Sequence, residues 1–172
     1  AQVGVAVAPI DAWSLVFEGF DAAHEGVRES LCALGNGYFT TRGVAVWAQA
    51  DDHHYPGTYL AGGYNRLRTE LAGRSVENED LVNLPNWLAV NWSIDGTEWF
   101  DTGKVTVHTY RQELDLRRGM LTRCIAFEDS QGRRSTLSER RLVSMKDMHV
   151  GALQLSLRAD NWSAAVTVHS AI

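Results

Sequence analysis

The sequence lacks several features that would place it in a special class of protein. No apolar run reaches the roughly 20 residues that a membrane-spanning helix needs. The formal net charge is −5 over 172 residues, and Lys and Arg form no cluster that would suit a nucleic acid or an anionic membrane. The first residues lack the basic segment and apolar core of a secretion signal. The sequence therefore predicts a soluble, cytoplasmic protein whose partners are neither nucleic acids nor membranes.

Cysteines and familiar catalytic motifs are scarce as well. Only Cys32 and Cys124 are present, both in apolar surroundings, and without a secretion signal we interpret them as small buried residues rather than a disulfide or metal pair. The G-x-S-x-G, P-loop, dinucleotide-binding, H-E-x-x-H and C-x-x-C patterns are missing. We therefore predict no metal, no cofactor and no catalytic residue within this chain.

What is present is the pattern of an antiparallel β protein. Hydrophobic content of 45% with 22% charge suits one globular domain, here residues 1–172. Apolar and polar residues alternate from Leu88 to Ile94, and Asp95-Gly96 is a strong hairpin turn leading into residues 97–100. Further strands are predicted at 13–20, 44–48, 104–116, 121–128, 134–144, 149–157 and 164–169. This spacing favours an all-β antiparallel sandwich without a helix longer than two turns, preceded by a loosely attached terminus through Ile10.

A glycine-rich corner organises the first half of the chain. Gly35, Gly37 and Gly43 fall within nine positions, and glycine is favoured where the backbone has positive φ or approaches another segment closely. Apolar residues on both sides predict a tight corner between packed strands. Asn36 and Arg42 would then be held on a rigid support, although an ordinary hairpin turn with an incidental Asn and Arg is the alternative.

Residues 49–86 show little regular periodicity, and long irregular segments in compact domains commonly carry function. Asp51 to His54 contains two histidines, which we interpret as a solvated loop rather than a metal site. Carboxylates gather at residues 77–80, and cleavage of a glycosidic bond requires a carboxylate pair. Their spacing does not place two of them across a sugar, so we favour a solvated role.

The tryptophans offer a second route to sugar binding, because aromatic rings can stack on sugar faces. Trp92 and Trp99 follow the alternation of the predicted strands. We therefore expect both to lie in the core.

Three motifs, in the same order, resemble the N-terminal domain of glycoside hydrolase family 65, the group of maltose, trehalose and kojibiose phosphorylases and related hydrolases. They are residues 29–43 (ESLCALGNGYFTTRG), 56–66 (PGTYLAGGYNR) and 81–87 (LVNLPNW). Residues 138–145 and 166–172 also look like that domain, so the resemblance covers nearly everything after Trp13.

The resemblance implies a division of labour between two domains. In the family the N-terminal domain is a large antiparallel β-sandwich, a super-sandwich, and the chemistry takes place in a following (α/α)6 barrel that is absent from this sequence. A glutamate of the barrel is the general acid, and phosphate or an activated water inverts the anomeric carbon. We expect this chain to be an incomplete N-terminal domain, inactive alone, with inorganic phosphate as co-substrate of the parent enzyme if that enzyme is a phosphorylase.

The resemblance also implies candidate contact residues. The loops would pack on the catalytic barrel and border the site of a glucose-containing disaccharide through Asn36, Arg42, Tyr59, Asn65, Arg66 and Asn83. Two other functions remain open. One is a stand-alone carbohydrate-binding module using an exposed tryptophan such as Trp87 or Trp162, and the other is an assembly domain that forms a homodimer.

Overall fold

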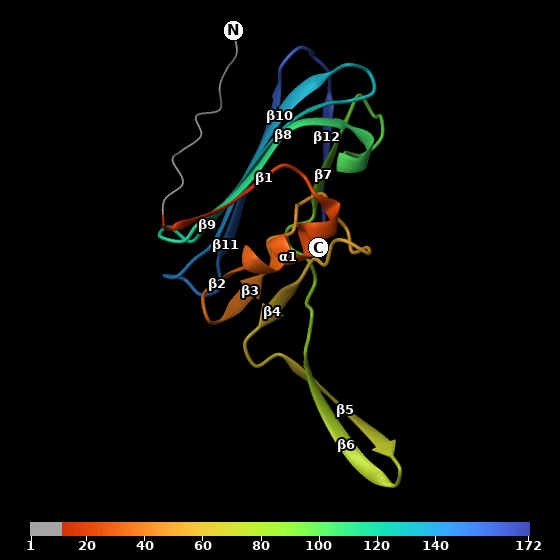
Figure 1. The fold of residues 1–172 in the computed structure, drawn as a ribbon, viewed down its shortest axis with the longest axis vertical. Helices are drawn as coiled ribbons and strands as arrows, with labels where there is room; N and C mark the ends of the chain where they lie inside the picture. The colour runs from red at the N-terminus through yellow and green to blue at the C-terminus, as the bar shows by residue number, and fades with distance from the viewer. Residues whose placement is uncertain (1–11) are drawn as a thin grey trace.

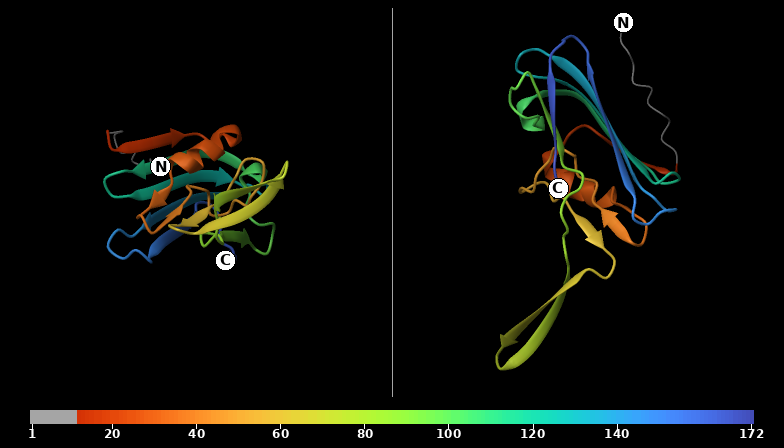
Figure 2. Two further views of the ribbon diagram at one scale, coloured as in Figure 1. Left: turned by 90° about the horizontal axis from the view of Figure 1, so that it is seen from below. Right: turned by 180° about the vertical axis from the view of Figure 1, so that it is seen from behind.

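The computed structural model describes residues 12–172, so the loosely attached terminus predicted through Ile10 lies outside the described residues. Figure 1 shows a β-sandwich body and a long hairpin that projects from one end of the body. The two further views in Figure 2 show the same separation of hairpin and body. All strand pairs are antiparallel. The predicted antiparallel β-sandwich is confirmed.

The largest sheet has five strands in the order β1-β8-β9-β10-β11. Their bounds are β1 Ser14–Glu18, β8 Thr106–Asp115, β9 Met120–Glu128, β10 Arg134–Val143 and β11 Gly151–Ala159. Buried and half-buried side chains alternate along the whole of β9, as expected for a strand with one face toward the core. Each of these strands lies within two residues of its predicted range, because alternation and polar turns marked them clearly.

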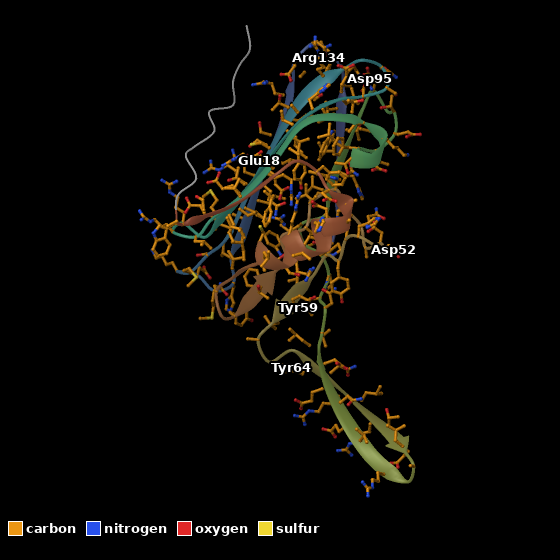
Figure 3. The ribbon with its side chains drawn as sticks, viewed as in Figure 1. Glu18, Asp52, Tyr59, Tyr64, Asp95 and Arg134 are labelled. Atoms are coloured by element: carbon orange, nitrogen blue, oxygen red, sulfur yellow. The ribbon has the colours of Figure 1, made fainter. Side chains whose placement is uncertain are left out.

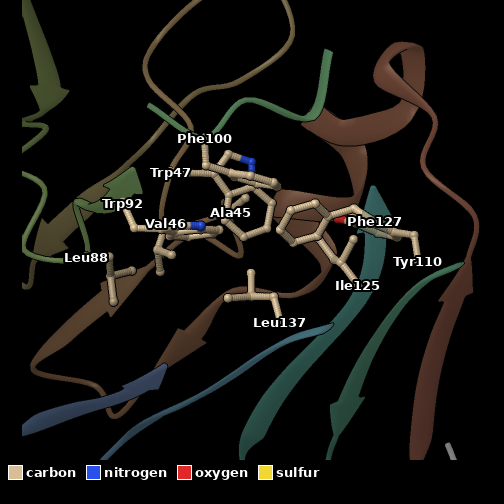
Figure 4. Packing of buried hydrophobic residues seen from close by; sticks show 10 residues of the cluster. All are labelled: Ala45, Val46, Trp47, Leu88, Trp92, Phe100, Tyr110, Ile125, Phe127 and Leu137. Carbon is tan, nitrogen blue, oxygen red and sulfur yellow. The ribbon is translucent and has the colours of Figure 1, made fainter. Parts of the chain in front are cut away.

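The second layer consists of shorter sheets. β7 (Val90–Ile94) pairs with β12 (Val166–Ser170), and β2 (Leu34–Gly35), β3 (Phe39–Thr41) and β4 (Thr58–Leu60) form a three-stranded sheet. Between the layers, Trp47, Trp92 and Phe100 pack together (Figure 4), with the last two rings stacked at 4.4 Å. Leu88 and Leu137 are fully buried in the same core, where truncating a leucine to alanine typically costs about 2–5 kcal/mol.

The strand predicted at 44–48 is wrong. These residues are buried, but they form a loop and turn that packs into the core. Two buried arginines of the large sheet serve the loop's backbone: Arg123 donates to the Gly43 carbonyl at 2.8 Å and Arg141 to the Val44 carbonyl. The Val90 N–H of β7 donates to the Val46 carbonyl at 3.0 Å. With its carbonyls satisfied in these ways, the apolar segment is buried without forming a strand.

The expectation of no helix longer than two turns is also wrong. Helix α1 (Ala22–Leu31) is capped by Asp21, whose carboxylate accepts from the Ala23 N–H at 3.1 Å. The side chains that this helix buries are Glu25 and Glu29, one turn apart. A helix that turns carboxylates inward has no apolar periodicity, which is why the pattern hid it. Within the described residues, no helix is long and apolar enough to cross a membrane.

Residues 49–86 are more regular than predicted. β5 (Tyr64–Leu71) and β6 (Arg74–Leu81) pair as a hairpin, which we call the arm, with a turn at Ala72 and Gly73 that both have positive φ. Every residue of both strands is exposed. Without a buried face the arm has no alternation of apolar residues, so its sequence reads as irregular.

The Asp95-Gly96 turn is confirmed, since both residues have positive φ (53° and 66°) and the Thr97 N–H donates to the Ile94 carbonyl at 3.1 Å. The strand expected after it does not form. Apart from the Thr97 bond of the turn itself, the backbone bond that returns from residues 97–100 to β7 in the described residues is Phe100 N–H to the Trp92 carbonyl. Trp99 is consequently 47% exposed, against the prediction that it lies in the core, whereas Trp92 is buried as predicted.

Both cysteines are free. Cys32 is fully buried and burial raises the pKa of its thiol, while Cys124 is half-buried. The interpretation of both as small packing residues agrees with this arrangement.

Candidate functional site

The three motifs converge on one hollow at the end of the body from which the arm projects. Its volume is about 600 Å³, and we call it the motif groove. It is lined by Tyr38 and Phe39 from the first motif, Thr58 and Leu60 from the second, Leu84 and Trp87 from the third, and His149 and Gly151. Trp87 packs so closely on Gly151 that a Cβ there would lie 2.7 Å from the indole. The groove is therefore mainly apolar and formed by segments far apart in sequence.

Asn36 holds the glycine corner to the large sheet. Its side-chain oxygen accepts from the backbone N–H groups of Tyr38 and Phe39 at 3.0 and 3.1 Å. Its amide nitrogen donates to the carbonyls of Ser144 and Met148 at 2.8 and 3.1 Å. All four hydrogen-bonding positions of this amide are thus used inside the chain.

Asn83 plays a similar part at the second motif. It accepts from the Thr58 N–H at 3.1 Å and donates to the Pro56 carbonyl at 2.9 Å, so it fixes the segment that enters β4. Gly57, which lies between Pro56 and Thr58, leaves room for Tyr59 and Arg42. A Cβ at this position would lie 2.6 Å from the Tyr59 hydroxyl and 2.8 Å from Arg42 Cδ. The structure therefore brings Arg42, Tyr59 and Asn83 together.

Arg42 is anchored to helix α1. It donates to the Gly26 carbonyl at 3.0 Å and lies 3.6 Å from the Glu29 carboxylate, with its guanidinium over the Tyr55 ring. Glu29 also accepts from His54 Nδ1 at 2.8 Å. That hydrogen bond raises the pKa of His54 above its usual value. The prediction of a solvated loop is wrong for His54, whose side chain is only 12% exposed because it is bound to a buried carboxylate.

Asn65 and Arg66 lie apart from this cluster, on the arm. Figure 3 labels Tyr59 in the body and Tyr64 where the arm begins. Arg66 pairs with Glu79 at 2.6 Å and Arg68 with Glu77 at 2.7 Å, all on one face of the hairpin. The carboxylates at 77–80 are exposed, in agreement with the solvated role favoured from the sequence.

The opposite face of the arm exposes three apolar side chains among polar ones, which are Asn65, Thr69, Arg74, Asn78 and Asp80. Leu67 and Leu71 on β5 are 59% and 60% exposed, and Val76 on β6 lies on the same face. Sequence reasoning missed these residues, since without the strands they show no common face. The Ala72-Gly73 pair is the only local signal that could have indicated the hairpin.

The buried carboxylates are occupied by cationic neighbours. Glu25 lies 3.2 Å from Arg28, Glu29 contacts His54, and Glu139 lies 2.6 Å from Arg123. Across the residues that the structure describes, no three His, Cys, Asp or Glu side chains gather as metal ligands would. The chemistry of this end of the molecule is therefore apolar contact and hydrogen bonding.

Comparison with known proteins identifies the family. The model of the glycosyl hydrolase family 65 N-terminal domain matches residues 15–172. An uncharacterized glycosyl hydrolase of Mycobacterium tuberculosis is 46% identical over 162 residues, which cover 94% of this chain and 12% of that protein. A kojibiose phosphorylase of Thermoanaerobacter brockii is 25% identical over 94% of this chain and 20% of its own length.

A solved structure agrees with the sequence comparison. The structure named "Putative kojibiose phosphorylase from human microbiome" superposes with a TM-score of 0.79 at 25% identity. The match covers 87% of this chain and 20% of that chain. This chain thus spans between about an eighth and a fifth of the length of these relatives.

Proposed function

This chain belongs to glycosyl hydrolase family 65, as its N-terminal domain, and from that premise we propose that it docks on the family's catalytic barrel and leaves bond cleavage to it. The motif groove and the face of the arm that carries Leu67, Leu71 and Val76 are the docking surface. Relatives named as kojibiose, maltose and trehalose 6-phosphate phosphorylases support an α-glucosidic disaccharide as substrate of the complete enzyme. Inorganic phosphate is then the co-substrate for phosphorolysis, and water for hydrolysis.

The observation that carries the proposal is the exposure of the arm. An isolated two-stranded hairpin is only marginally stable in water. This one leaves the body and turns Leu67, Leu71 and Val76 into solvent on one face. Exposed apolar groups that lie together mark a contact surface, so the arm requires a second body that covers this face.

The motif groove extends that surface into the body. Thr58 in β4 forms a bridge with Leu84, which follows the arm, so arm and groove are joined at the root of the hairpin. Asn36 and Asn83 bond to the backbone N–H groups of residues that line the groove, so they hold its side chains in place. A partner that covers the arm therefore also meets the groove.

The pairing of the carboxylates supports the proposal that the isolated chain is inactive. The buried ones are bonded to arginine or histidine within the domain, and those of the arm pair with Arg66 and Arg68. A phosphorolysis and hydrolysis assay with maltose, trehalose and kojibiose should give no turnover. Turnover by the isolated chain would contradict the proposal.

Docking is tested with the catalytic region of the mycobacterial relative, produced without the segment that matches this chain. We expect the parent chain to bind it, and the double variant Leu67→Ser, Leu71→Ser to bind at least about ten-fold more weakly, because two apolar contacts are lost. Val168→Ser is the matched control, since Val168 is 61% exposed on β12 of the body. Equal binding by the arm variant would refute the docking role of the arm.

The dimerisation alternative is separated by sedimentation of the chain alone. A dimer that the same double variant abolishes would assign the arm to a second copy of this chain. A monomer at all concentrations leaves the barrel as its partner.

A further inference from the structure

Trp99 lies on a second surface that the docking role does not use. Two hollows of about 280 and 480 Å³ meet at the segment from Glu98 to Lys104, and Trp99 lines both. We call this segment with its two hollows the Trp99 surface. Figure 3 labels Asp95, which precedes the segment, at the end of the molecule opposite the arm. A ligand here would not compete with a partner that covers the arm.

The indole of Trp99 is presented to solvent in a fixed position. It is 47% exposed, and its ring lies 5.8 Å from the His169 ring at a tilt of 50°. The neighbouring Phe100 is buried in the aromatic core of Figure 4, which anchors the backbone of the segment. An exposed aromatic ring with a supported base is suited to contact the apolar face of a ligand.

Charges around Trp99 are already paired. Lys104 lies 2.8 Å from Glu98, Arg133 lies 2.6 Å from Asp129, and Asp101 accepts from the backbone N–H of Gly103. Since each cation has a carboxylate partner, the surface offers little to select an anionic ligand. It selects instead for groups that both donate and accept hydrogen bonds.

Neutral hydrogen-bonding groups line both hollows. Gln131 and Ser130 line the smaller hollow and Gln49 the larger one, and all three are exposed. An amide supplies two donors and an acceptor, which matches a ligand rich in hydroxyls. The larger hollow falls within the roughly 300–1,000 Å³ typical of small-molecule sites.

We propose that the Trp99 surface binds a neutral oligosaccharide. One sugar ring stacks on the indole, and its hydroxyls bond to the amides of Gln49 and Gln131. The site holds carbohydrate without cleaving it, so it adds a binding function to the domain that is independent of docking on the barrel. The sequence pointed to Trp87 and Trp162 for such a role, but Trp87 packs on Gly151, and Trp162 donates to Ser135 Oγ at 3.0 Å.

The test is calorimetric titration of the whole chain with maltotriose. We expect saturable binding by the parent, and affinity about ten-fold lower in Trp99→Ala, the loss expected from removing one aromatic contact. Trp13→Ala is the matched control, because Trp13 is 49% exposed on another part of the surface and should leave affinity unchanged. Equal unfolding midpoints for parent and Trp99→Ala would show that the variant remains folded.

Three results would overturn the proposal. They are no saturable heat with the parent, equal affinity in Trp99→Ala and the parent, or tighter and salt-sensitive binding of trehalose 6-phosphate than of a neutral sugar. The docking experiment uses a different partner and different residues. Failure of sugar binding is therefore distinguishable from failure of the docking proposal.

Discussion

Replacing Arg123 by methionine should strongly destabilise the fold, because this buried guanidinium joins both layers. Its Nη1 donates to Glu139 at 2.6 Å and its Nε to the Tyr110 hydroxyl at 3.1 Å. Its Nη2 donates to Gln112 at 3.0 Å and to the Gly43 carbonyl at 2.8 Å. Removing one partner of a buried ion pair typically costs about 3–5 kcal/mol, since the remaining groups are left without a partner in a dry site.

The pKa of the neighbouring Arg141 shows how strongly this site is shielded from water. Burial, opposed by the charge of Glu139, lowers the pKa of Arg141 to about 10. Arg141 lies 3.0 Å from the other oxygen of Glu139, so that carboxylate keeps one cation when Arg123 is removed. We therefore expect a loss at the lower end, about 3 kcal/mol, rather than the full cost of an isolated charge.

Urea unfolding of the parent chain and of Arg123→Met at neutral pH measures this loss of stability. Arg140→Met is the matched control on the neighbouring strand β10, because Arg140 is exposed and should change the free energy of unfolding by no more than about 0.5 kcal/mol. Amide hydrogen exchange should also accelerate at residues 44–47, whose loop loses the bond to the Gly43 carbonyl. A loss below about 1 kcal/mol in Arg123→Met would refute the idea that the arginine holds the loop in place.

Three further changes probe the other end of the molecule. The bond to Glu29 raises the pKa of His54. The stability that this bond contributes is therefore complete below about pH 6.5 and is lost as pH rises through the folded-state pKa. His54→Gln should remove this pH dependence in urea unfolding, whereas the control variant His108→Gln, at an exposed position, should keep it. Asn36→Ala should cost about 1–3 kcal/mol, because four hydrogen bonds to backbone groups are lost, two of them half-buried, and an unchanged midpoint would contradict that role. Gly37→Ala should raise the energy of a residue at φ +84° by about 1–2 kcal/mol in the same assay.

Strands β8 to β11 were predictable because one face of each strand is less accessible than the other over most of its length. In β9 the buried residues fall at every second position, and polar turns separate it from its neighbours. The sequence then carries the period of the structure directly. The glycine corner was predictable for a local reason as well, since Gly37 has the positive φ that the pattern indicates.

The elements that sequence reasoning missed depend on partners elsewhere in the fold. Helix α1 buries Glu25, which Arg28 of the same helix contacts, and Glu29, which Arg42 and His54 contact from the loops that follow. The apolar run at 44–48 looks like a strand, but arginines on β9 and β10 bond the adjacent carbonyls. The partners of Glu29 and of these carbonyls lie outside the element concerned, so the periodicity of apolar residues could not reveal them.

The candidate residues divide by what their polar atoms do, and this division bears on how the domain would contact a partner. All four hydrogen-bonding positions of the Asn36 side chain are used by backbone groups of this chain, and Asn83 fixes the segment around Gly57. The Asn36 amide has little left to offer another molecule, so its substitution should lower stability before it lowers affinity. The surface that remains free consists of the apolar groove and the arm, where Arg66 is held by Glu79. In the docking that we propose, the polar motif residues therefore support the surface, and the apolar residues beside them make the contact.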